Sequence, residues 1–538
     1  MINNKNFDGI DNKYAKLICA IAFALAVVLA VWLRFSQIGV KPFHHDEGVN
    51  SYFLLNLERH GEYRYDPTNY HGPTLYYFAL FALRLFGATD FALRFMPALF
   101  GTLAVLMVWL LRKQLGPVGT PVAAFLMALS PGLVYFSRDF IHEMSFACFS
   151  LGIVVGAWRY SESKKFIWLA LMAASAGLLF ATKETAIITA VVLILAAVCA
   201  TAWDITRKLF RQREFTPGKI DLSFDHLMAA VIIFIFINII FYTSFFVPQT
   251  YPDGVKHIYW MGLTDAVKSV ALWTSRSGSE HKKDFGFYLG ILLKLELPLL
   301  IGSLLAGVFV VWKGTKFWLF VAAWTIGLAL AYSIIGYKTP WLIISTLIPM
   351  AILSGYAAQQ IYNVLPLSKL RLLWVMALAG ILIFNGAMAW KVNFEKYDDN
   401  ANSSGYFSGA GQKLKLKPYV DGLFGYVYAQ TDRGAFQLVD AIKSVSDKLP
   451  TKNDTPIYIA TPDYWPLPWY LRDFDQVAYT GSLPGGESPN ISQPIIIGSV
   501  SQQLDLDRLS KWRALPQPFL LRPGVELLIY VRDDTQSQ

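Results

Sequence analysis

The sequence predicts a polytopic α-helical membrane protein that carries a small α/β domain at its C-terminal end. Hydrophobic residues make up 54% of the chain, charged residues make up only 16%, and the mean hydropathy is +0.40. The apolar residues gather in runs of roughly 20, the length that crosses a hydrocarbon core of about 30 Å. After residue 390 these runs stop and short, mixed segments follow.

The apolar runs predict about eleven spanning helices, with further helices at the membrane interface. The first run, near Leu17 to Leu33, has the position of a signal peptide. It is long and lacks a clear small-residue cleavage site before Arg34, so we expect a retained helix. Segment 73–86 is apolar but short for a span, and we expect it to lie at the interface. The predicted spans are 17–35, 91–111, 119–136, 143–160, 165–181, 184–203, 227–247, 286–312, 316–335, 341–362 and 371–390.

The basic residues between these spans predict the orientation, because short cytoplasmic loops gather Lys and Arg. With 73–86 left out of the count, the basic loops all fall on one side, which places the N-terminus in the cytoplasm and the C-terminal domain outside it. We therefore expect a multi-pass protein of the cell (inner) membrane. The net charge of +9 then reflects topology, and no basic tract interleaved with aromatic residues indicates nucleic-acid binding. The basic loops hold Arg112-Lys113, Arg159 with Lys164-Lys165, Arg207-Lys208, Lys313 with Lys316, and Lys369 with Arg371.

On this topology the unusual polar residues lie together on the outer face. The first outer loop, 36–90, contains the string Phe43 to Asn50, in which His44 and His45 precede the carboxylates Asp46 and Glu47. Ionised groups near hydrocarbon are costly unless they face water, a partner or a ligand, so we predict an active site here. Any one of these groups alone could be structural, as a snorkelling lysine or an ion pair. The other members are Arg138-Asp139, His142-Glu143, Lys183-Glu184, the loop 248–284, and Tyr337 to Trp341.

Further motifs carry a resemblance to a known superfamily. They are the segment from His71 to Phe78, Arg94 to Leu99 at the start of a helix, and Leu129 to Arg138. With the acidic pair, they resemble the polyprenyl-phosphate-sugar-dependent glycosyltransferases of the GT-C fold, which include protein O-mannosyltransferases and the lipid A aminoarabinose transferase. Within this group the chain looks most like a prokaryotic flippase-activity-associated subfamily, which has a His-Asp-Glu-Gly string and a tail similar to Pro466 to Arg472.

The resemblance implies transfer of a monosaccharide from a polyprenyl-phosphate-linked donor to a protein, lipid or glycan acceptor outside the cytoplasm. Asp46 is then the base for the acceptor hydroxyl, and Glu47 beside it orients the acceptor or a metal. A phosphate leaving group needs only one base. Oligosaccharyltransferases share the fold, but the chain has no Trp-Trp-Asp motif, so we expect transfer of a single sugar.

Four cations are candidates for the donor phosphate: Arg138, Lys183, Lys338 and His71. Arginine offers a planar fork for phosphate oxygens, and lysine offers a compact positive charge. The alternative is that Arg138 pairs with Asp139 or Glu143, and that Lys183 pairs with Glu184, because buried charges are normally paired.

A divalent metal is a further candidate, and no other cofactor is indicated. His44, His45, His71, His142 and Glu143 are of the ligand types that suit zinc or manganese, but their spacing matches no metal signature. The aminoarabinose transferase pattern has Glu-Lys where this chain has Tyr70-His71, so a metal site cannot be carried over from the resemblance.

The polar segment 391–424 predicts a linker between a transmembrane catalytic domain, 1–390, and an extracytoplasmic α/β domain, 425–538. In that domain we expect a helix over 431–449 and strands at 457–460, 477–479, 494–497 and 525–531. Without a glycine-rich phosphate loop a nucleotide role has no support. Trp465, Trp469 and Tyr470 are candidates for stacking on a sugar ring, with a place in the core as the alternative.

Two other functional classes fit a membrane protein of this composition. A lipid-linked sugar flippase or transporter is one, although transporters usually show inverted repeats and helices broken at the bilayer midplane, which this sequence does not suggest. A non-catalytic accessory protein is the other, but it gives no reason for acids and phosphate-type cations to share one face.

Overall fold

The structure is a computed structural model that describes residues 13–69, 71–210, 223–250, 254–276, 282–395, 426, 430–484 and 491–533. The chain divides into two compact units: residues 1–36 with 56–393, and residues 37–55 with 394–538. The first outer loop is therefore split, and residues 37–55 belong to the same unit as the C-terminal domain. The boundary falls within one helix, α2 His45–His60.

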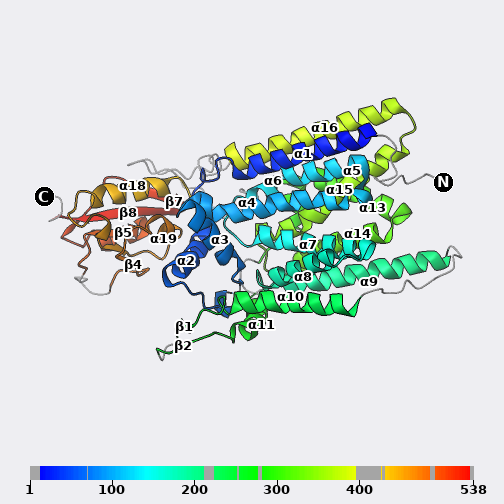
Figure 1. Ribbon diagram of the computed structural model, residues 1–538. Helices are drawn as coiled ribbons and strands as arrows, with labels where there is room; N and C mark the ends of the chain where they lie inside the picture. Colours follow the sequence, from blue (N-terminus) through cyan, green and yellow to red (C-terminus); the bar gives the residue numbers. More distant parts are fainter. Residues whose placement is uncertain are drawn as a thin grey trace. The chain divides into compact units, whose positions relative to one another are not determined.

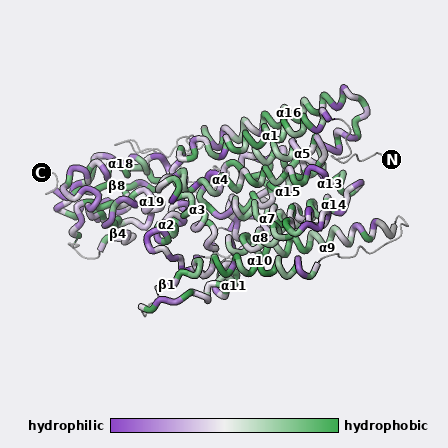
Figure 2. The backbone as a smooth tube through the Cα atoms, viewed as in Figure 1, coloured by the Kyte–Doolittle hydropathy of each residue, from purple (hydrophilic) through white to green (hydrophobic). Residues whose placement is uncertain are grey.

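The first unit is helical, and its tube in Figure 2 is mainly hydrophobic. Figure 1 labels the helices of this unit in the order in which they occur along the chain. They are α1 Lys13–Phe35, α3 Thr74–Phe86, α4 Asp90–Met107, α5 Arg112–Leu129, α6 Pro131–Phe136, α7 Glu143–Ser163, α8 Phe166–Phe180, α9 Ala186–Phe210, α10 Phe224–Tyr242, α11 Gly262–Arg276, α12 Phe287–Leu295, α13 Leu297–Lys313, α14 Lys316–Ile334, α15 Ile344–Val364 and α16 Ser368–Trp390.

Among the described residues, seven helices are long and apolar enough to span a membrane, or eight if the bent pair α12–α13 counts as one span. The stretch Asp90–Leu129 is one of the seven, although it contains α4 and α5. A helix is present in every one of the predicted spans, and the chain is a multi-span membrane protein. α15 packs against α5, α13, α14 and α7, and its residues from Ile344 to Gln360 are all buried. Segment 73–86 forms the short apolar helix α3.

Two predicted spans are interrupted, and buried side chains stabilise each interruption. Gly116 breaks α5 with a φ of 78°, and the amide oxygen of Gln359 accepts hydrogen bonds there from the N–H groups of Val118 at 2.8 Å and Gly119 at 3.2 Å. Helices α12 and α13 meet at an angle of 107° at Glu296. The predicted continuous helix over 286–312 is thus wrong in detail, and so is that over 119–136, which begins after the Gly116 break but is divided into α5 and α6 at Ser130.

The carboxylate of Glu296 also explains where α6 begins. Its Oε1 accepts hydrogen bonds from the Ser130 hydroxyl at 2.7 Å and the Gly132 N–H at 2.8 Å. A carboxylate at a helix N-terminus satisfies free N–H groups and complements the helix dipole. The sequence 119–136 is therefore divided into α5 and α6 at Ser130, whose hydroxyl oxygen also accepts from the Leu133 N–H at 3.2 Å, and Glu296 adds a second cap from a distant part of the chain.

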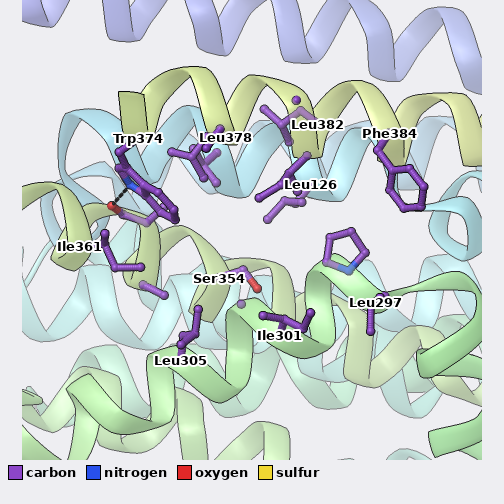
Figure 3. Close-up of a pocket in the computed structure, with 18 residues that line it drawn as sticks. Leu126, Leu297, Ile301, Leu305, Ser354, Ile361, Trp374, Leu378, Leu382 and Phe384 are labelled. Atoms are coloured by element: carbon purple, nitrogen blue, oxygen red, sulfur yellow. Dashed lines mark hydrogen bonds between the residues drawn. The ribbon is translucent and has the colours of Figure 1, made fainter. Parts of the chain in front are cut away.

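A cavity of about 470 Å³ lies between α5, α13, α15 and α16 (Figure 3). Its lining is almost wholly apolar and includes Leu126 of α5, Leu297 of α13, and Trp374 and Phe384 of α16, which lie at opposite ends of the view. The Ser354 hydroxyl donates to the Met350 carbonyl at 2.8 Å. Since no acid or base lines it, the cavity does not provide groups for chemistry.

The second unit contains a six-stranded sheet with the order β4-β3-β5-β8-β6, and β7 pairs with β8. β3 is parallel to β4 and β5, whereas β8 is antiparallel to β5, β6 and β7. Helix α18 Gly434–Ser446 packs on β7 and β8, and the short helix α19 Leu467–Tyr470 follows β3. The strands are β3 Ile457–Ile459, β4 Val477–Tyr479, β5 Ile495–Ser499, β6 Trp512–Ala514, β7 Phe519–Arg522 and β8 Val525–Arg532.

The predicted α/β domain is therefore present, with a shorter helix than expected and two additional strands, β6 and β7. β6 has three residues, and β7 is irregular between Leu520 and Arg522, so neither shows a clear alternation of apolar and polar residues. Of the predicted linker 391–424, only residues 391–395 are among the described residues.

Candidate active site

The acidic pair lies in the first turn of α2, within the second unit. Glu47 accepts a hydrogen bond at its Oε2 from the His44 N–H at 2.9 Å, and His44 accepts one at its Nδ1 from the Asp46 N–H at 3.2 Å. The bond to Glu47 is one half of a capping box, in which the third helical residue accepts from the N–H of the residue before the helix, and the His44 ring caps the N–H of the second helical residue, Asp46. Histidine here takes the place of the usual serine or threonine.

The capping box gives the two carboxylates different surroundings. Glu47 is fully buried, whereas Asp46 is only partly buried. The Asp46 carboxylate makes no hydrogen bond or ion pair with another described residue. Asp46 is therefore held by its backbone while its side chain stays available, and Glu47 is engaged in the helix cap.

His45 stands between these groups and the C-terminal domain. Burial lowers the pKa of His45 to about 4, with the nearby Asp46 carboxylate acting in the opposite direction. The ring is therefore neutral near pH 7. Its centroid is 6.0 Å from the ring of Trp465, which is partly exposed.

Close packing fixes the start of α2 in the second unit. The Phe43 ring stacks on Trp469 with 5.5 Å between centroids, and the Phe43 N–H donates to the Tyr470 hydroxyl at 2.8 Å. A Cβ added at Gly48 would lie 2.7 Å from the Cα of Pro466, so only glycine allows this approach. Trp469 is fully buried and Tyr470 is 9% exposed. The prediction that these two rings are available to a sugar is therefore wrong, because both are part of this core.

The first unit brings together a second group of predicted residues, between α3, α7 and α9. The Lys183 Nζ lies 2.6 Å from the Glu143 Oε1, and both side chains are buried. Burial alone would lower the pKa of Lys183, but the charges of Glu143 and Glu184 outweigh burial and raise the pKa above its ordinary value. Lys183 is therefore protonated. Its ion-pair partner is Glu143, and not Glu184, the partner in the structural alternative.

Glu184 pairs with His71 instead. The His71 Nδ1 is 3.1 Å from the Glu184 Oε2, and the side chain of His71 is 31% exposed whereas that of Glu184 is inaccessible. Burial would raise the pKa of Glu184, but His71 and Lys183 outweigh it and lower the pKa. His71 is thus the exposed edge of a buried charged cluster.

His142 completes this cluster, with its ring centroid 4.7 Å from that of His71. Burial, together with the positive field of His71 and Lys183, holds the pKa of His142 well below its usual range, so the ring is neutral. Among the described residues, the buried atoms Nε2 of His142 and Oε1 of Glu184 have no hydrogen-bond partner. Buried polar atoms are normally satisfied, so these two atoms are candidates for contact with water or a ligand.

Backbone contacts hold the two sides of this cluster together. The Gly72 N–H donates to the Thr182 carbonyl at 3.0 Å, and the hydroxyls of Thr74 and Thr182 are 2.8 Å apart. A Cβ at Gly72 would lie 2.1 Å from the Ala181 carbonyl oxygen. The residues that follow His71 and precede Lys183 therefore touch directly.

Arg138 is buried at the end of α1, where its Nη1 donates to the carbonyls of Leu33 at 2.9 Å and Ser36 at 2.6 Å. Arg34, also buried, donates to the carbonyls of Ala128 and Met127, each at 3.1 Å. These guanidinium groups satisfy free carbonyls at helix C-termini. Arg34 is not among the predicted site residues, and the bonds of Arg138 favour a structural role for Arg138.

Lys338 donates from its Nζ to the carbonyls of Ile335 at 2.6 Å and Lys283 at 3.1 Å. Burial lowers the pKa of Lys338, with Asp284 acting in the opposite direction. The residue before it, Tyr337, contributes to the electrostatic surroundings of Lys183. Of the predicted phosphate-binding residues, Lys183 and His71 lie in one cluster, and Arg138 and Lys338 have separate backbone partners.

The proposed metal ligands do not form a set. Within the described parts of the chain, no three His, Cys, Asp or Glu side chains come together as metal ligands would. His44 has its Nδ1 in the helix cap, and Glu143 is paired with Lys183. The residues therefore do not fit the divalent metal that the sequence left open.

Comparison with known proteins supports the fold. Residues 70–242, about a third of the chain, match the family described as dolichyl-phosphate-mannose-protein mannosyltransferase. No curated protein matches the chain. The structure of ArnT from Cupriavidus metallidurans bound to undecaprenyl phosphate superposes with a TM-score of 0.61 at 13% identity, covering 97% of this chain and 98% of ArnT.

The archaeal oligosaccharyltransferase AglB from Archaeoglobus fulgidus, in complex with an inhibitory peptide and a dolichol-phosphate, superposes with a TM-score of 0.56 at 12% identity. The superposition covers 93% of this chain and 71% of AglB. The chain thus has the GT-C fold that the sequence motifs predicted. The flippase-activity-associated subfamily stays a prediction.

Proposed function

We propose that this GT-C-fold membrane protein is a glycosyltransferase that moves a monosaccharide from a polyprenyl-phosphate-linked donor to an acceptor outside the cytoplasm. The observation that carries the proposal is the carboxylate of Asp46, which is held on a capped helix turn and has no partner among the described residues. Its neighbour Glu47 is buried in the cap. A positioned acid without a structural partner is the form that a general base takes.

The chemistry requires one base and one stabilised leaving group. Asp46 accepts the proton of the acceptor hydroxyl as that oxygen forms a bond to the anomeric carbon. The bond from the anomeric carbon to the phosphate oxygen breaks, and polyprenyl phosphate leaves with the electron pair. Positive charge near the leaving phosphate lowers the barrier, because it stabilises charge that develops in the transition state.

Lys183 and His71 are the first candidates for contact with the donor phosphate. Lys183 is held in its charged form by buried acids, and His71 is the exposed member of the same cluster. His142, with its Nε2 unpartnered, is a neutral hydrogen-bonding group beside them. Arg138 and Lys338 are the second candidates, because the Arg138 Nη1 and the Lys338 Nζ already donate hydrogen bonds to backbone carbonyl groups.

The proposed orientation has the N-terminus in the cytoplasm and both the acidic turn and the C-terminal unit outside, in the inner membrane. Lipid-linked donors, membrane lipids and a protein, lipid or glycan acceptor are the proposed partners. The basic loops support this orientation, because their charge bias sets topology. A cysteine-accessibility assay on whole cells, with one cysteine placed in loop 248–284 and one near Lys369, tests it.

The decisive experiment compares the purified wild type with Asp46→Asn and a matched control on the same helix, Glu58→Gln, which is exposed. Each protein receives a panel of polyprenyl-phosphate sugars and a membrane extract, and the release of free polyprenyl phosphate is followed. We expect release by the wild type and the control and at least a hundredfold slower release by Asp46→Asn, the scale of general-base catalysis. No release with any donor, together with movement of labelled lipid-linked sugar across liposome bilayers, would establish a flippase instead.

A further inference from the structure

An aromatic surface lies beside the acidic turn within the second unit. The Trp465 ring is surrounded by three others: His45 at 6.0 Å, Tyr52 at 6.1 Å and Tyr464 at 5.2 Å between centroids. Tyr52 is 47% exposed, and Trp465 and Tyr464 are partly exposed. We call these four residues the Trp465 ledge. It differs from the neighbouring Trp469, whose ring is fully buried.

A charged pair borders the ledge. Arg522 at the end of β7 forms an ion pair with Asp463 and donates from its Nη1 to the Trp465 carbonyl at 3.3 Å. The side chain of Asp463 is 46% exposed, whereas that of Arg522 is only 12% exposed. Arg522 therefore fixes the backbone beneath the Trp465 ring, and Asp463 presents acceptor oxygens at the edge of the ledge.

The ledge and the candidate base are parts of one rigid arrangement. His45 belongs to the ledge and directly precedes Asp46, and Tyr52 lies on the same helix. The close approach of Gly48 to Pro466 joins the first turn of α2 to the segment that carries Trp465. The ledge therefore adjoins the helix turn that carries Asp46, within the same unit of the chain.

We infer that the Trp465 ledge binds a saccharide ring and presents it to Asp46, an inference that rests on the proposed function. A sugar ring has an apolar C–H face and a rim of hydroxyl groups. Exposed aromatic rings supply an apolar surface of low conformational entropy, and tryptophan and tyrosine combine such a face with a polar edge. The carboxylate of Asp463 accepts hydrogen bonds from hydroxyl groups, as charged acceptors do strongly. The ring comes from a glycan acceptor or from the sugar of the donor.

Ligand-observed saturation-transfer NMR on the full-length protein tests this inference without requiring turnover. The protein is placed in lipid nanodiscs, because maltoside detergents would compete as sugars. One arm uses free disaccharides, cellobiose, maltose and chitobiose, and the other uses a short-chain, water-soluble isoprenyl-phosphate mannose. Binding in the first arm identifies an acceptor-type saccharide, and binding in the second arm alone identifies the sugar of the donor.

The variants are Trp465→Ala, Trp465→Phe and Tyr52→Ala, with Leu504→Ala as the control because Leu504 is 81% exposed on the same unit. We expect Trp465→Ala to weaken binding roughly tenfold, which is the upper range for a single aromatic contact. Trp465→Phe should recover part of it, Tyr52→Ala should weaken it less, and the control should bind as the wild type does.

Two outcomes overturn the inference. One is wild-type binding by both Trp465→Ala and Tyr52→Ala. The other is weaker retention in nanodiscs with unchanged saccharide binding, which would make the ledge a membrane anchor. Because binding is measured apart from transfer, polyprenyl phosphate release with unchanged KM values for donor and acceptor in Trp465→Ala and Tyr52→Ala would also overturn the inference and would leave the proposed function standing.

Discussion

Replacing Glu47 by glutamine should leave sugar transfer nearly intact, whereas replacing it by alanine should impair both stability and transfer. The reason is the capping box, in which the Glu47 Oε2 accepts from the His44 N–H at 2.9 Å. Glutamine keeps an acceptor oxygen and is a normal residue at this position of a capping box. It loses only the attraction of the charge for the helix N-terminus, about 0.3–1 kcal/mol.

Alanine removes the acceptor altogether. The His44 N–H is then left unsatisfied beside a fully buried position, which costs about 1–3 kcal/mol. If the same free energy is needed to hold Asp46 in place for reaction, the rate falls roughly 5- to 150-fold. The free energy of unfolding should fall by the same 1–3 kcal/mol, an estimate for one lost buried hydrogen bond.

The assay is the release of polyprenyl phosphate by purified protein, with unfolding followed on the same samples and Glu58→Gln as the reference. A catalytic or metal-binding Glu47 would behave differently, since glutamine cannot replace a base and such a loss is about a hundredfold or more. A folded Glu47→Gln variant as slow as Asp46→Asn would refute the assignment of Glu47 to the helix cap.

Three further changes have expected outcomes that follow from the contacts. Lys183→Met leaves Glu143 buried without its partner and should cost about 3–5 kcal/mol of stability, while the double variant Lys183→Met/Glu143→Leu should recover most of it without recovering transfer. Gly72→Ala should destabilise the protein in thermal unfolding, because its Cβ would lie 2.1 Å from a carbonyl oxygen, whereas Gly290→Ala, with nothing within 4 Å, should have little effect. The free energy of unfolding should fall as pH drops from about 6.5 towards 4, because the unfolded chain protonates His45 in this range while burial keeps the pKa of His45 in the folded protein at about 4. A free energy of unfolding that does not change with pH in this range would contradict this prediction.

Much of the fold could be predicted from the sequence, because length and hydropathy determine which segments span a bilayer. The interruptions could not. Glu296 lies within an apolar run, and its carboxylate caps α6 across a long separation in sequence. Gln359 likewise satisfies the N–H groups at the Gly116 break from another helix. A hydropathy average over neighbouring residues of the sequence detects neither contact.

The candidate site was predicted in part. The motifs drew attention to Lys183, Glu143, His71 and His142, which do lie in one cluster, but Lys183 pairs with Glu143 and not with Glu184, the partner in the structural alternative. Spacing along the chain does not show which of two nearby carboxylates faces a lysine. Trp469 is fully buried and Trp465 is partly exposed, although both belong to the same aromatic segment of the sequence.

The acidic pair illustrates why neighbours in sequence need not share a role. Successive residues of an α-helix point about 100° apart, since 3.6 residues make one turn, so Asp46 and Glu47 cannot face one centre. The spacing His44-x-x-Glu47 is that of a capping box, but a histidine at its first position conceals the signal, because serine and threonine are the residues expected there. One carboxylate thus holds the helix turn, and the side chain of the other takes no part in the cap.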